Sequence, residues 1–337
     1  MQTLIEQELQ NGFFSAIQIS HLSPHHQDAF FTGYTTNEAL NPIDQFTQFD
    51  LASLTKALFT APAFYQLFEN KELVPETKLS SFFPAFSDDI TLLSLLNHSV
   101  GFPAWIPFYE NKCSVAYSDK KQLVIDAIVA CKPDYSTRYS DLTFLLLGFI
   151  LEKIHRAPLS EIFADFKQDV STVPKLQYTP AYAMRHEVVA TSFSSIRNTI
   201  CYGEVEDENC YWLEGVTGHA GLFGSATDVI LWIFALMEKE WFSKWFEITN
   251  KAGFDTPEAT NSSYGDNNPF DAAGHLGFTG TAFLFSPSEL SATVVLTNRT
   301  HPDVNKKEWK KRIKKIRRQA FHHHHRHHHQ THTQPHH

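Results

Sequence analysis

FDLASLTKALFT, at residues 49–60, is the stretch from which the rest of the chain can be interpreted. It is apolar and free of Pro, and it places Ser53 and Lys56 three residues apart. In a helix that begins at about Ser53, this spacing puts the hydroxyl and the amine on one face, within reach of each other. A Ser needs a neighbour that takes its proton, and a Lys desolvated at an apolar helix start can be neutral enough to do so. The pattern predicts a nucleophile beside its base, although one Ser-x-x-Lys match alone is weak evidence.

Composition indicates a globular protein with an uneven charge distribution. The 337 residues are 42% hydrophobic and include 29 Phe, enough for one large or two modest cores. Ten of the 28 Lys and Arg and one of the 37 acids lie at 306–337, which leaves residues 1–305 with a net charge of -18. This acidic body disfavours nucleic-acid binding, whereas the basic C-terminal segment could contact an anionic surface.

No export or membrane-spanning signal is visible in the sequence. Residues 1–9 lack a basic region followed by a continuous apolar run, and the longest charge-free apolar run, residues 142–151, is too short to cross a bilayer. We therefore expect a cytoplasmic protein without a transmembrane segment.

The four cysteines do not resemble a disulfide framework in a chain of this length, and we expect free thiols at Cys113, Cys131, Cys201 and Cys210. A metal site formed by Cys201, Cys210 and His219 would fit no zinc spacing, so we expect no metal site.

Strand patterns lie at both ends of the chain and helical patterns in its middle. Alternating apolar residues predict strands at 14–20, 28–35, 281–285 and 292–297, and helical periodicity occurs at 53–70, 92–97, 121–130, 141–155 and 228–236. This order predicts an α+β fold, with a discontinuous sheet domain at 1–60 and 225–320 and a mainly helical domain at 61–224. A His-rich disordered tail is expected at 321–337.

Residues 306–320 predict an amphipathic helix with an apolar stripe formed by Trp309, Ile313, Ile316 and Ala320. The stripe would pack on the sheet with its cations solvated, or the helix would contact an anionic membrane or partner. Ten of the 19 His residues lie at 322–337, which is typical either of a native metal-binding tail or of an expression tag.

Three further clusters could complete a site around Ser53. RYSD at 138–141 precedes an apolar helix, so Tyr139 would lie on a loop, while Ser140 or Asp141 could also be a simple helix cap. GHLGFTG at 274–280 leads into a strand, where glycines would let a substrate approach backbone N–H groups or would only form a strand entry. LNHSVG at 96–101 indicates a helix end, at which a structural role for His98 is expected.

Together these motifs resemble those of the serine β-lactamase-related family. The motifs that carry the resemblance, in chain order, are FDLASLTK at 49–56, LNHSVG at 96–101, YSDL at 139–142, GHAGLF at 218–223 and GHLGFTGT at 274–281. The family groups class C β-lactamases, penicillin-binding proteins, D-amino-acid peptidases and family VIII esterases, and the similarity covers about residues 12–320. It implies a β-lactamase/transpeptidase-like fold, an antiparallel sheet flanked by helices plus an all-helical domain.

The resemblance also implies roles for single residues. Ser53 resembles the acylating nucleophile, Lys56 the base or proton relay beside it, and Tyr139 the tyrosine that exchanges protons with the nucleophile and leaving group. The backbone N–H groups of Ser53 and Phe278 would form the oxyanion hole, and no metal or organic cofactor is implied. The residues expected to contact the substrate are Asp141, His275, Gly277 and Thr279.

Two departures from the family pattern bear on the substrate. Asp141 stands where the family usually has an Asn that donates to a substrate carbonyl, and an ionised Asp can only accept. His275 stands where Lys is usual and would be near half-charged around neutral pH. Both weaken the β-lactamase interpretation; Arg299 could restore a positive charge or be a structural surface residue.

We therefore expect a serine hydrolase that forms an acyl-enzyme on Ser53 and cleaves a small ester or a D-amino-acid-type amide. One alternative is a β-lactamase or penicillin-binding protein, and another is a non-hydrolytic protein that binds cell-wall fragments or assembles with itself. Selectivity is expected to depend on aromatic residues near Ser53, among them Trp105, Phe108, Tyr109 and Trp212.

Overall fold

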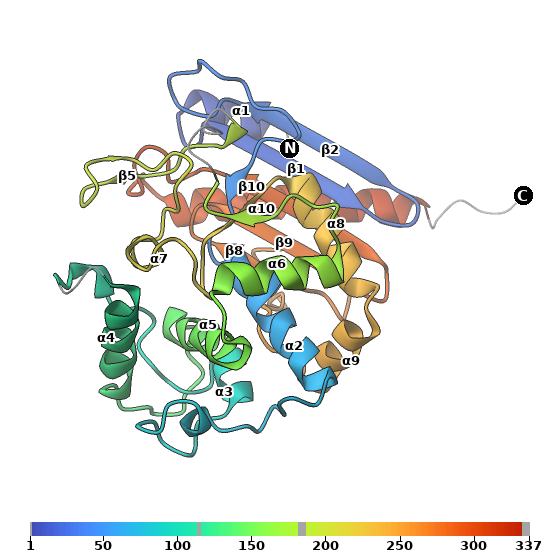
Figure 1. The fold of residues 1–337 in the computed structure, drawn as a ribbon. Coiled ribbons are helices and arrows are strands. Elements are labelled where there is room, and N and C mark those ends of the chain that lie inside the picture. Colours follow the sequence, from blue (N-terminus) through green and yellow to red (C-terminus); the bar gives the residue numbers. More distant parts are fainter. Residues whose placement is uncertain (1, 113–115, 181–186, 332–337) are drawn as a thin grey trace, which may run out of the picture.

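Five antiparallel strands form the main sheet of the protein. The computed structural model describes residues 2–112, 116–180 and 187–331, with side chains described as far as Phe321. The strand order is β2-β1-β10-β9-β8, so strands from the two ends of the chain lie side by side (Figure 1). The strands are β1 (Ala16–Leu22), β2 (Gln27–Gly33), β8 (Ala273–Gly277), β9 (Thr281–Ser286) and β10 (Ser291–Thr297). The predicted α+β fold with a sheet built from both termini is confirmed.

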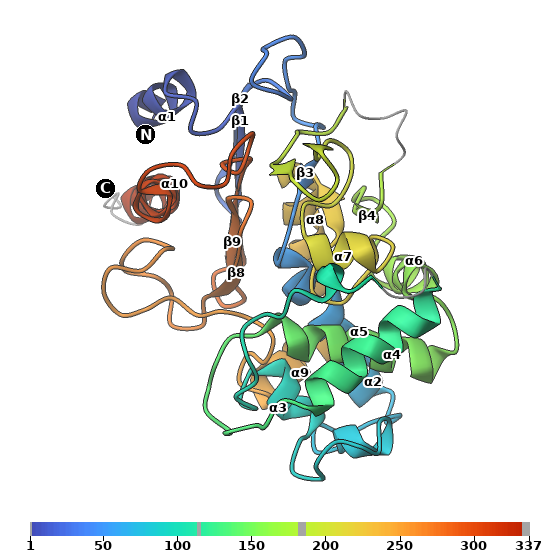
Figure 2. The same ribbon diagram turned by 90° about the vertical axis from the view of Figure 1, so that its left-hand side faces the viewer.

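Side chains that alternate along the strands bury both faces of this sheet. On β10, Val295 packs into a cluster with Ile313 and Ile316 of α10, whereas Val294 faces a second cluster that includes Trp232 of α8. Helices α1 (Gln2–Gln10) and α10 (Trp309–Thr331) therefore cover one face, and α8 (Ala226–Met237) lies on the other (Figure 2).

The predicted apolar stripe of the C-terminal helix packs on the sheet. Ile313, Ile316 and Ala320 are at most 2% exposed. The helix differs from the expectation at its end, because α10 continues past Ala320 to Thr331 where a disordered tail was predicted. The described part of the His-rich segment, residues 322–331, contains neither Pro nor Gly, so no proline in it removes a helical hydrogen bond.

The middle of the chain is mainly helical, as predicted. Its elements are η1 (Lys56–Thr60, a π-helical turn), α2 (Ala61–Glu69), η2 (Leu79–Ser81), α3 (Leu92–Leu96), η3 (Phe108–Glu110), α4 (Tyr117–Val129), α5 (Asp141–His155), α6 (Leu159–Val170), α7 (Glu208–Trp212) and α9 (Glu240–Ile248). The sequence patterns did not predict α1, α6, α7 or α9. The proposed division into domains at residues 60 and 225 stays a prediction.

Helix α5 is the buried centre of the helical region. Every residue from 142 to 151 is buried, because the helix is apolar around its whole circumference. Ser140 caps its first turn, since the Ser140 hydroxyl accepts a hydrogen bond from the Leu142 N–H at 3.0 Å. A Cβ on Gly148 would lie 2.9 Å from the Gly218 backbone nitrogen, so two glycines allow the Gly-rich segment at 215–224 to pass close to α5. These contacts fix the residues just before α5, including Tyr139.

Short strands complete the fold near the Ser53 segment. A three-stranded sheet has the order β3-β7-β4, and a separate pair is formed by β5 and β6. Their bounds are β3 (Phe49–Asp50), β4 (Gln177–Tyr178), β5 (Phe193–Ser194), β6 (Thr199–Ile200) and β7 (Leu222–Gly224). Because β3 ends at Asp50, this small sheet anchors the chain immediately before Ser53.

Two further expectations concern the whole chain. Cys131, Cys201 and Cys210 are free thiols, as predicted, and Cys113 lies outside the described residues. Within the described ranges, no helix combines the length and apolarity needed to cross a membrane.

Candidate active site

Ser53 lies in a tight turn between β3 and the following helix. The chain reverses at Ala52, whose φ of 49° is in the left-handed region that most side chains avoid. This conformation is held by Asp50, because its Oδ1 accepts a hydrogen bond from the Ala52 N–H at 2.8 Å. Helical hydrogen bonds begin directly after the turn, where the Lys56 N–H donates to the Ser53 carbonyl at 3.1 Å. Ser53 and Lys56 thus face the same side, as predicted.

The Lys56 ammonium contacts three oxygens at once. Its Nζ lies 2.7 Å from Ser53 Oγ, 2.7 Å from Tyr139 Oη and 2.8 Å from Asp141 Oδ1. An ammonium has three N–H donors, so each of these oxygens can accept one of them. Residues far apart in the sequence therefore converge on one buried amine.

The charge of Lys56 differs from the expectation. Burial on its own would favour the neutral amine, as predicted from its apolar surroundings, but the Asp141 carboxylate and, after it, the Tyr139 hydroxyl beside the amine outweigh burial and raise the pKa of Lys56 above its ordinary value. In the resting protein Lys56 is an ammonium paired with Asp141 rather than a free base. The sequence-based expectation of a neutral Lys was wrong because it did not include this ion pair.

Tyr139 lies beside the nucleophile on the loop that precedes α5. Its ring centroid is 4.7 Å from that of His98 and 5.8 Å from that of His275. Burial of the hydroxyl raises the pKa of Tyr139, although the Lys56 charge acts in the opposite direction. His98 Nδ1 accepts from the Ser140 N–H at 3.2 Å, so His98 supports the Tyr139 loop, as its predicted structural role requires.

Phe278 lies on the turn between β8 and β9, across the cavity from Ser53. Neither the Phe278 N–H nor the Ser53 N–H donates to another group in the described part of the chain. Both residues line the same cavity. Their two N–H groups are therefore available to a developing negative charge on a substrate oxygen.

Gly277 and Thr279 hold the turn against the nucleophile segment and do not line this cavity. The Thr279 hydroxyl is fully buried and donates to the Asp50 carbonyl at 2.9 Å. A Cβ on Gly277 would lie 3.1 Å from the Leu51 carbonyl oxygen, so a glycine lets the two segments approach closely. Both residues thus join the turn to the nucleophile segment, and the contact of Gly277 and Thr279 with a substrate stays a prediction.

His275 and Arg299 also differ from the expectations. His275 is 4% exposed, and burial, followed by the Lys56 charge, lowers its pKa to about 3. It is therefore neutral, not half-charged, around neutral pH. Arg299 is fully buried, which excludes both a surface position and a free cation for a substrate carboxylate.

The cavity beside Ser53 has a volume of about 480 Å³. The predicted aromatics Trp105 and Tyr109 line it, whereas Phe108 is fully buried and Trp212 lines a neighbouring cavity. Five acids, here called the acidic wall, also line it: Asp50, Asp141, Glu206, Asp207 and Glu208. No Lys or Arg is among the described residues that line this cavity. A larger cavity of about 830 Å³ lies near residues 250–270, but Ser53 does not line it.

The members of the acidic wall differ in charge. Lys56 neutralises Asp141, and Arg197 pairs with Glu208 at 3.2 Å. Burial raises the pKa of Glu206 to about 8, and Asp50 beside it acts in the same direction. Glu206 is therefore mainly protonated at neutral pH.

Asp50 and Asp207 carry the remaining negative charge of the wall. Burial raises the pKa of Asp50 to about 6, although two N–H groups donate to its carboxylate. Burial would also raise the pKa of Asp207, but His219 and the Cys210 N–H outweigh it and lower the value to about 2. The sequence patterns pointed to neither residue as part of the site, although Asp50 lies three positions before Ser53 and Asp207 lies in the acidic run at 204–208.

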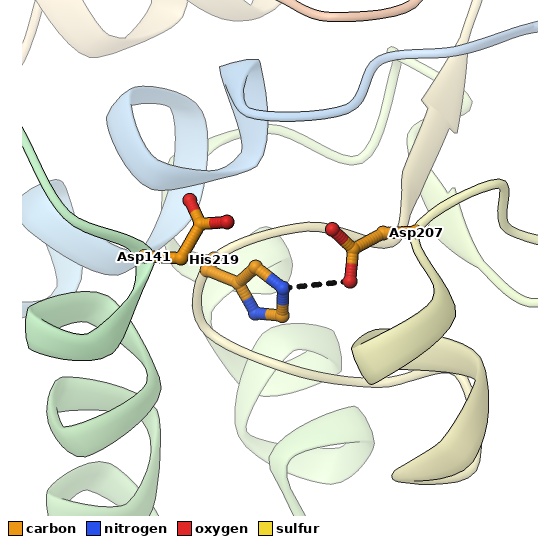
Figure 3. Close-up of side chains that lie close together, drawn as sticks. All are labelled: Asp141, Asp207 and His219. Carbon is orange, nitrogen blue, oxygen red and sulfur yellow. Dashed lines mark hydrogen bonds and ion pairs between the residues drawn. The ribbon is translucent and has the colours of Figure 1, made fainter. Parts of the chain in front are cut away.

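Within the described residues, one group of side chains has the spacing of a metal site. Ligand atoms of Asp141, Asp207 and His219 lie within 4.8 Å of one another (Figure 3). However, Asp207 Oδ1 is already hydrogen-bonded to His219 Nε2 at 2.9 Å, and Asp141 is paired with Lys56. The three groups therefore have partners within the protein, and the alternative set of Cys201, Cys210 and His219 is not brought together.

Comparisons with known proteins agree with this geometry. The sequence profile of the family described as Beta-lactamase matches residues 25–318. The chain belongs to the beta-lactamase family. The match includes every residue proposed above for the active site, from Ser53 to Phe278, and it makes this chain a hydrolase of that family.

Curated relatives of this beta-lactamase-family protein have different names. An "N-acetylmuramyl-L-alanine amidase" of Bacillus subtilis is 28% identical, with 77% of this chain and 69% of the relative covered. A "Putative D-alanyl-D-alanine carboxypeptidase" of Escherichia coli is 26% identical, with 77% and 70% covered. The resemblance to the family is thus confirmed, while the substrate is left open.

Solved structures share the fold of this beta-lactamase-family protein. A class C β-lactamase from Rhodobacter sphaeroides superposes with a TM-score of 0.68 at 14% identity, covering 94% of this chain and 97% of that one. EstCE1, described as a hydrolase with promiscuous acyltransferase activity, superposes with a TM-score of 0.69 at 17% identity and the same coverage. At this identity they support the fold alone, and they confirm the predicted β-lactamase/transpeptidase-like architecture.

Proposed function

We propose that Ser53 forms an acyl-enzyme and that the protein cleaves a small ester or a D-amino-acid-type amide. The observation that carries this proposal is the Lys56 ammonium, which lies within hydrogen-bonding distance of both Ser53 Oγ and Tyr139 Oη. Lys56 acts as the base in the form that has lost its proton to the solvent: Ser53 Oγ attacks the substrate carbonyl carbon while its proton passes to the Lys56 amine. The ammonium so formed, with the Tyr139 hydroxyl beside it, then gives a proton to the leaving group as the bond to that group breaks. Water then attacks the acyl-enzyme, and the acid product leaves.

The Ser53 and Phe278 N–H groups support this chemistry. They face the cavity without another partner in the described structure, so they can stabilise the negative oxygen of the tetrahedral intermediate. Such a donor contributes about 100- to 1000-fold to kcat in comparable sites.

The charge of the cavity supports the choice of substrate. A β-lactam or another substrate with a carboxylate would meet the acidic wall, a neutral His275 and an Asp141 that can only accept hydrogen bonds. A neutral ester avoids this repulsion, and the ammonium group of a D-aminoacyl substrate would be attracted to Asp50 and Asp207. The names of the relatives, which include an amidase and a carboxypeptidase, support amide cleavage in this family.

Active-site labelling tests the nucleophile. A fluorophosphonate or a fluorescent penicillin should label Ser53, as determined by peptide mapping, and Ser53→Ala should lose both the label and the turnover of p-nitrophenyl esters. Ser118→Ala, at an exposed position of α4, is the matched control and should keep both. Turnover by Ser53→Ala at the wild-type rate would refute the proposal.

Steady-state rates rank the substrates. We expect kcat/KM for a p-nitrophenyl ester and for D-alanine p-nitroanilide to exceed kcat/KM for nitrocefin. More efficient turnover of nitrocefin than of the other two would contradict the proposed substrate class while leaving the nucleophile unaffected.

A further inference from the structure

The peptide group between Gly277 and Phe278 has hydrogen-bonding partners on one side only. Its N–H, the proposed oxyanion donor, belongs to Phe278, which lines the cavity, and it donates to no other group among the described residues. Its carbonyl, on Gly277, accepts from the Gly280 N–H at 3.0 Å and from Arg317 Nη2 at 3.2 Å. A charged side chain of the C-terminal helix is thus bonded to the same peptide plane that carries the oxyanion donor.

Arg317 is placed in an unusual way for a cation. It is 7% exposed, and its Nη2 also donates to the Thr281 carbonyl at 3.2 Å, at the other end of the same turn. Its hydrogen bonds go to backbone carbonyls and to no carboxylate among the residues that the structure describes. Burying a cation without an anionic partner is costly, so this position calls for a role beyond packing.

A second arginine holds the next peptide of the turn. Arg299 Nε donates to the Phe278 carbonyl at 2.9 Å, and its guanidinium carbon lies 4.3 Å from the Phe278 ring centroid and 3.6 Å from that of Trp309. Trp309 is the first residue of α10, the helix that covers this face of the sheet (Figure 2). The helix therefore restrains the turn from two points, Trp309 and Arg317.

From this arrangement we infer that Arg317 is a positioning residue for the oxyanion hole. It fixes the orientation of the Gly277–Phe278 peptide group. Through its hydrogen bond to the Gly277 carbonyl it also polarises the Phe278 N–H, which points away from that carbonyl in the same peptide plane. A polarised, fixed donor stabilises the oxyanion of the transition state more than the carbonyl of the bound substrate. The effect of Arg317 should therefore be on kcat rather than on KM. This inference rests on the proposed acyl-enzyme function.

The test compares Arg317→Gln, Arg317→Lys and the neighbouring Arg318→Gln. Arg318 is the matched control, because it lies on the same helix and donates to the Ser262 carbonyl and Asp266, both away from the turn. With a p-nitrophenyl ester, we expect Arg317→Gln to lower kcat about 10- to 100-fold while KM changes by less than about threefold. Binding of a phenylboronic acid, whose adduct with Ser53 presents an oxyanion-like oxygen, should weaken by a similar factor. Arg318→Gln should leave both values at the wild-type level.

Other outcomes separate this inference from the proposed function. A folded Arg317→Gln protein with wild-type kcat, or one with lower kcat but unchanged boronate affinity, would overturn the role of Arg317. If Arg317→Gln does not fold, Arg317→Lys is the test, because Lys keeps the positive charge but lacks the planar guanidinium that can bond two carbonyls at once. The kcat of Arg317→Lys should be about 3- to 10-fold below that of the wild type. A wild-type kcat for Arg317→Lys would overturn the inference. Loss of the nucleophile assignment would instead appear as turnover by Ser53→Ala, whatever the Arg317 variants do.

Discussion

Replacing Asp141 by Asn should make Lys56 a base at lower pH. The Asp141 carboxylate lies 2.8 Å from the Lys56 ammonium, and their ion pair is buried. At an effective dielectric constant of about 20, two unit charges at this distance attract by about 6 kcal/mol. Part of this attraction offsets the burial of Lys56, and close opposite charges typically change a pKa by about 1 to 3 units, or about 1.4 to 4 kcal/mol. The pKa of Lys56, now raised, should therefore fall by this amount in Asp141→Asn.

The pH dependence of kcat/KM measures this change. If neutral Lys56 helps to take the Ser53 proton, activity is lost as the pH falls through the pKa of Lys56, and this acidic limb should move to lower pH by about 1 to 3 units in Asp141→Asn. At a fixed pH on that limb, kcat/KM for a p-nitrophenyl ester should rise about 10-fold or more. The Asn amide can also donate to a substrate carbonyl, so nitrocefin turnover should rise as well.

Asp134→Asn is the control for this experiment. Asp134 lies on the loop that precedes α5 and pairs with Arg138 at 3.3 Å, but it does not contact Lys56. Its pH profile should match that of the wild type. An acidic limb that stays in place in Asp141→Asn, or that moves to higher pH, would refute the argument that the Asp141 charge controls the protonation of Lys56.

Three further predictions concern the surroundings of Ser53. Burial raises the pKa of Glu206 to about 8, so between about pH 4.5 and 8 only the unfolded chain releases this proton freely, and the stability of the wild type should fall as the pH rises through that range. Glu206→Gln should remove this loss and, in urea denaturation near pH 8, have a free energy of unfolding about 1 to 3 kcal/mol above that of the wild type. Equal free energies of unfolding at that pH would contradict the prediction. Gly277→Ala should slow the labelling of Ser53 by a fluorophosphonate about 100-fold, because the added Cβ would lie 2.1 Å from Thr281 Oγ1 and would displace the Phe278 turn. Labelling at the wild-type rate would contradict this prediction. The two carboxylate oxygens of Asp50 accept hydrogen bonds from the Ala52 N–H and the Glu206 N–H, so in Asp50→Asn the amide NH₂ must face one of these donors in either orientation. Asp50→Asn should therefore lower the free energy of unfolding by about 1 to 3 kcal/mol near pH 8. A urea midpoint equal to that of the wild type would refute this prediction.

The sequence correctly predicted those features of the site that depend on residues close together in the chain. One helical turn is enough to bring Ser53 and Lys56 together, and the apolar pattern after Asp141 fixes where α5 begins and hence where Tyr139 lies. The strand patterns near the two ends of the chain were sufficient to predict a sheet that joins them.

Properties that depend on distant partners were predicted poorly. The charge of Lys56 depends on Asp141, 85 positions away, and the charge of His275 depends on how deeply β8 is buried. Glu206 donates its backbone N–H to Asp50, 156 positions away, which no local pattern indicates. The family resemblance implied a substrate contact for Thr279, but it did not indicate that the Thr279 hydroxyl donates to the Asp50 carbonyl, 229 positions away.

The pairing of β1 with β10 has a consequence for the synthesis of the protein. Ser53 and Lys56 leave the ribosome well before β10 and before α10, the helix that holds the Phe278 turn. Until then β1 lacks one of its two neighbours, and the Phe278 turn lacks the helix that restrains it. A chain that stops before residue 291 therefore contains Ser53 and Lys56 but lacks both the central strand β10 and the helix that bonds to the Phe278 turn.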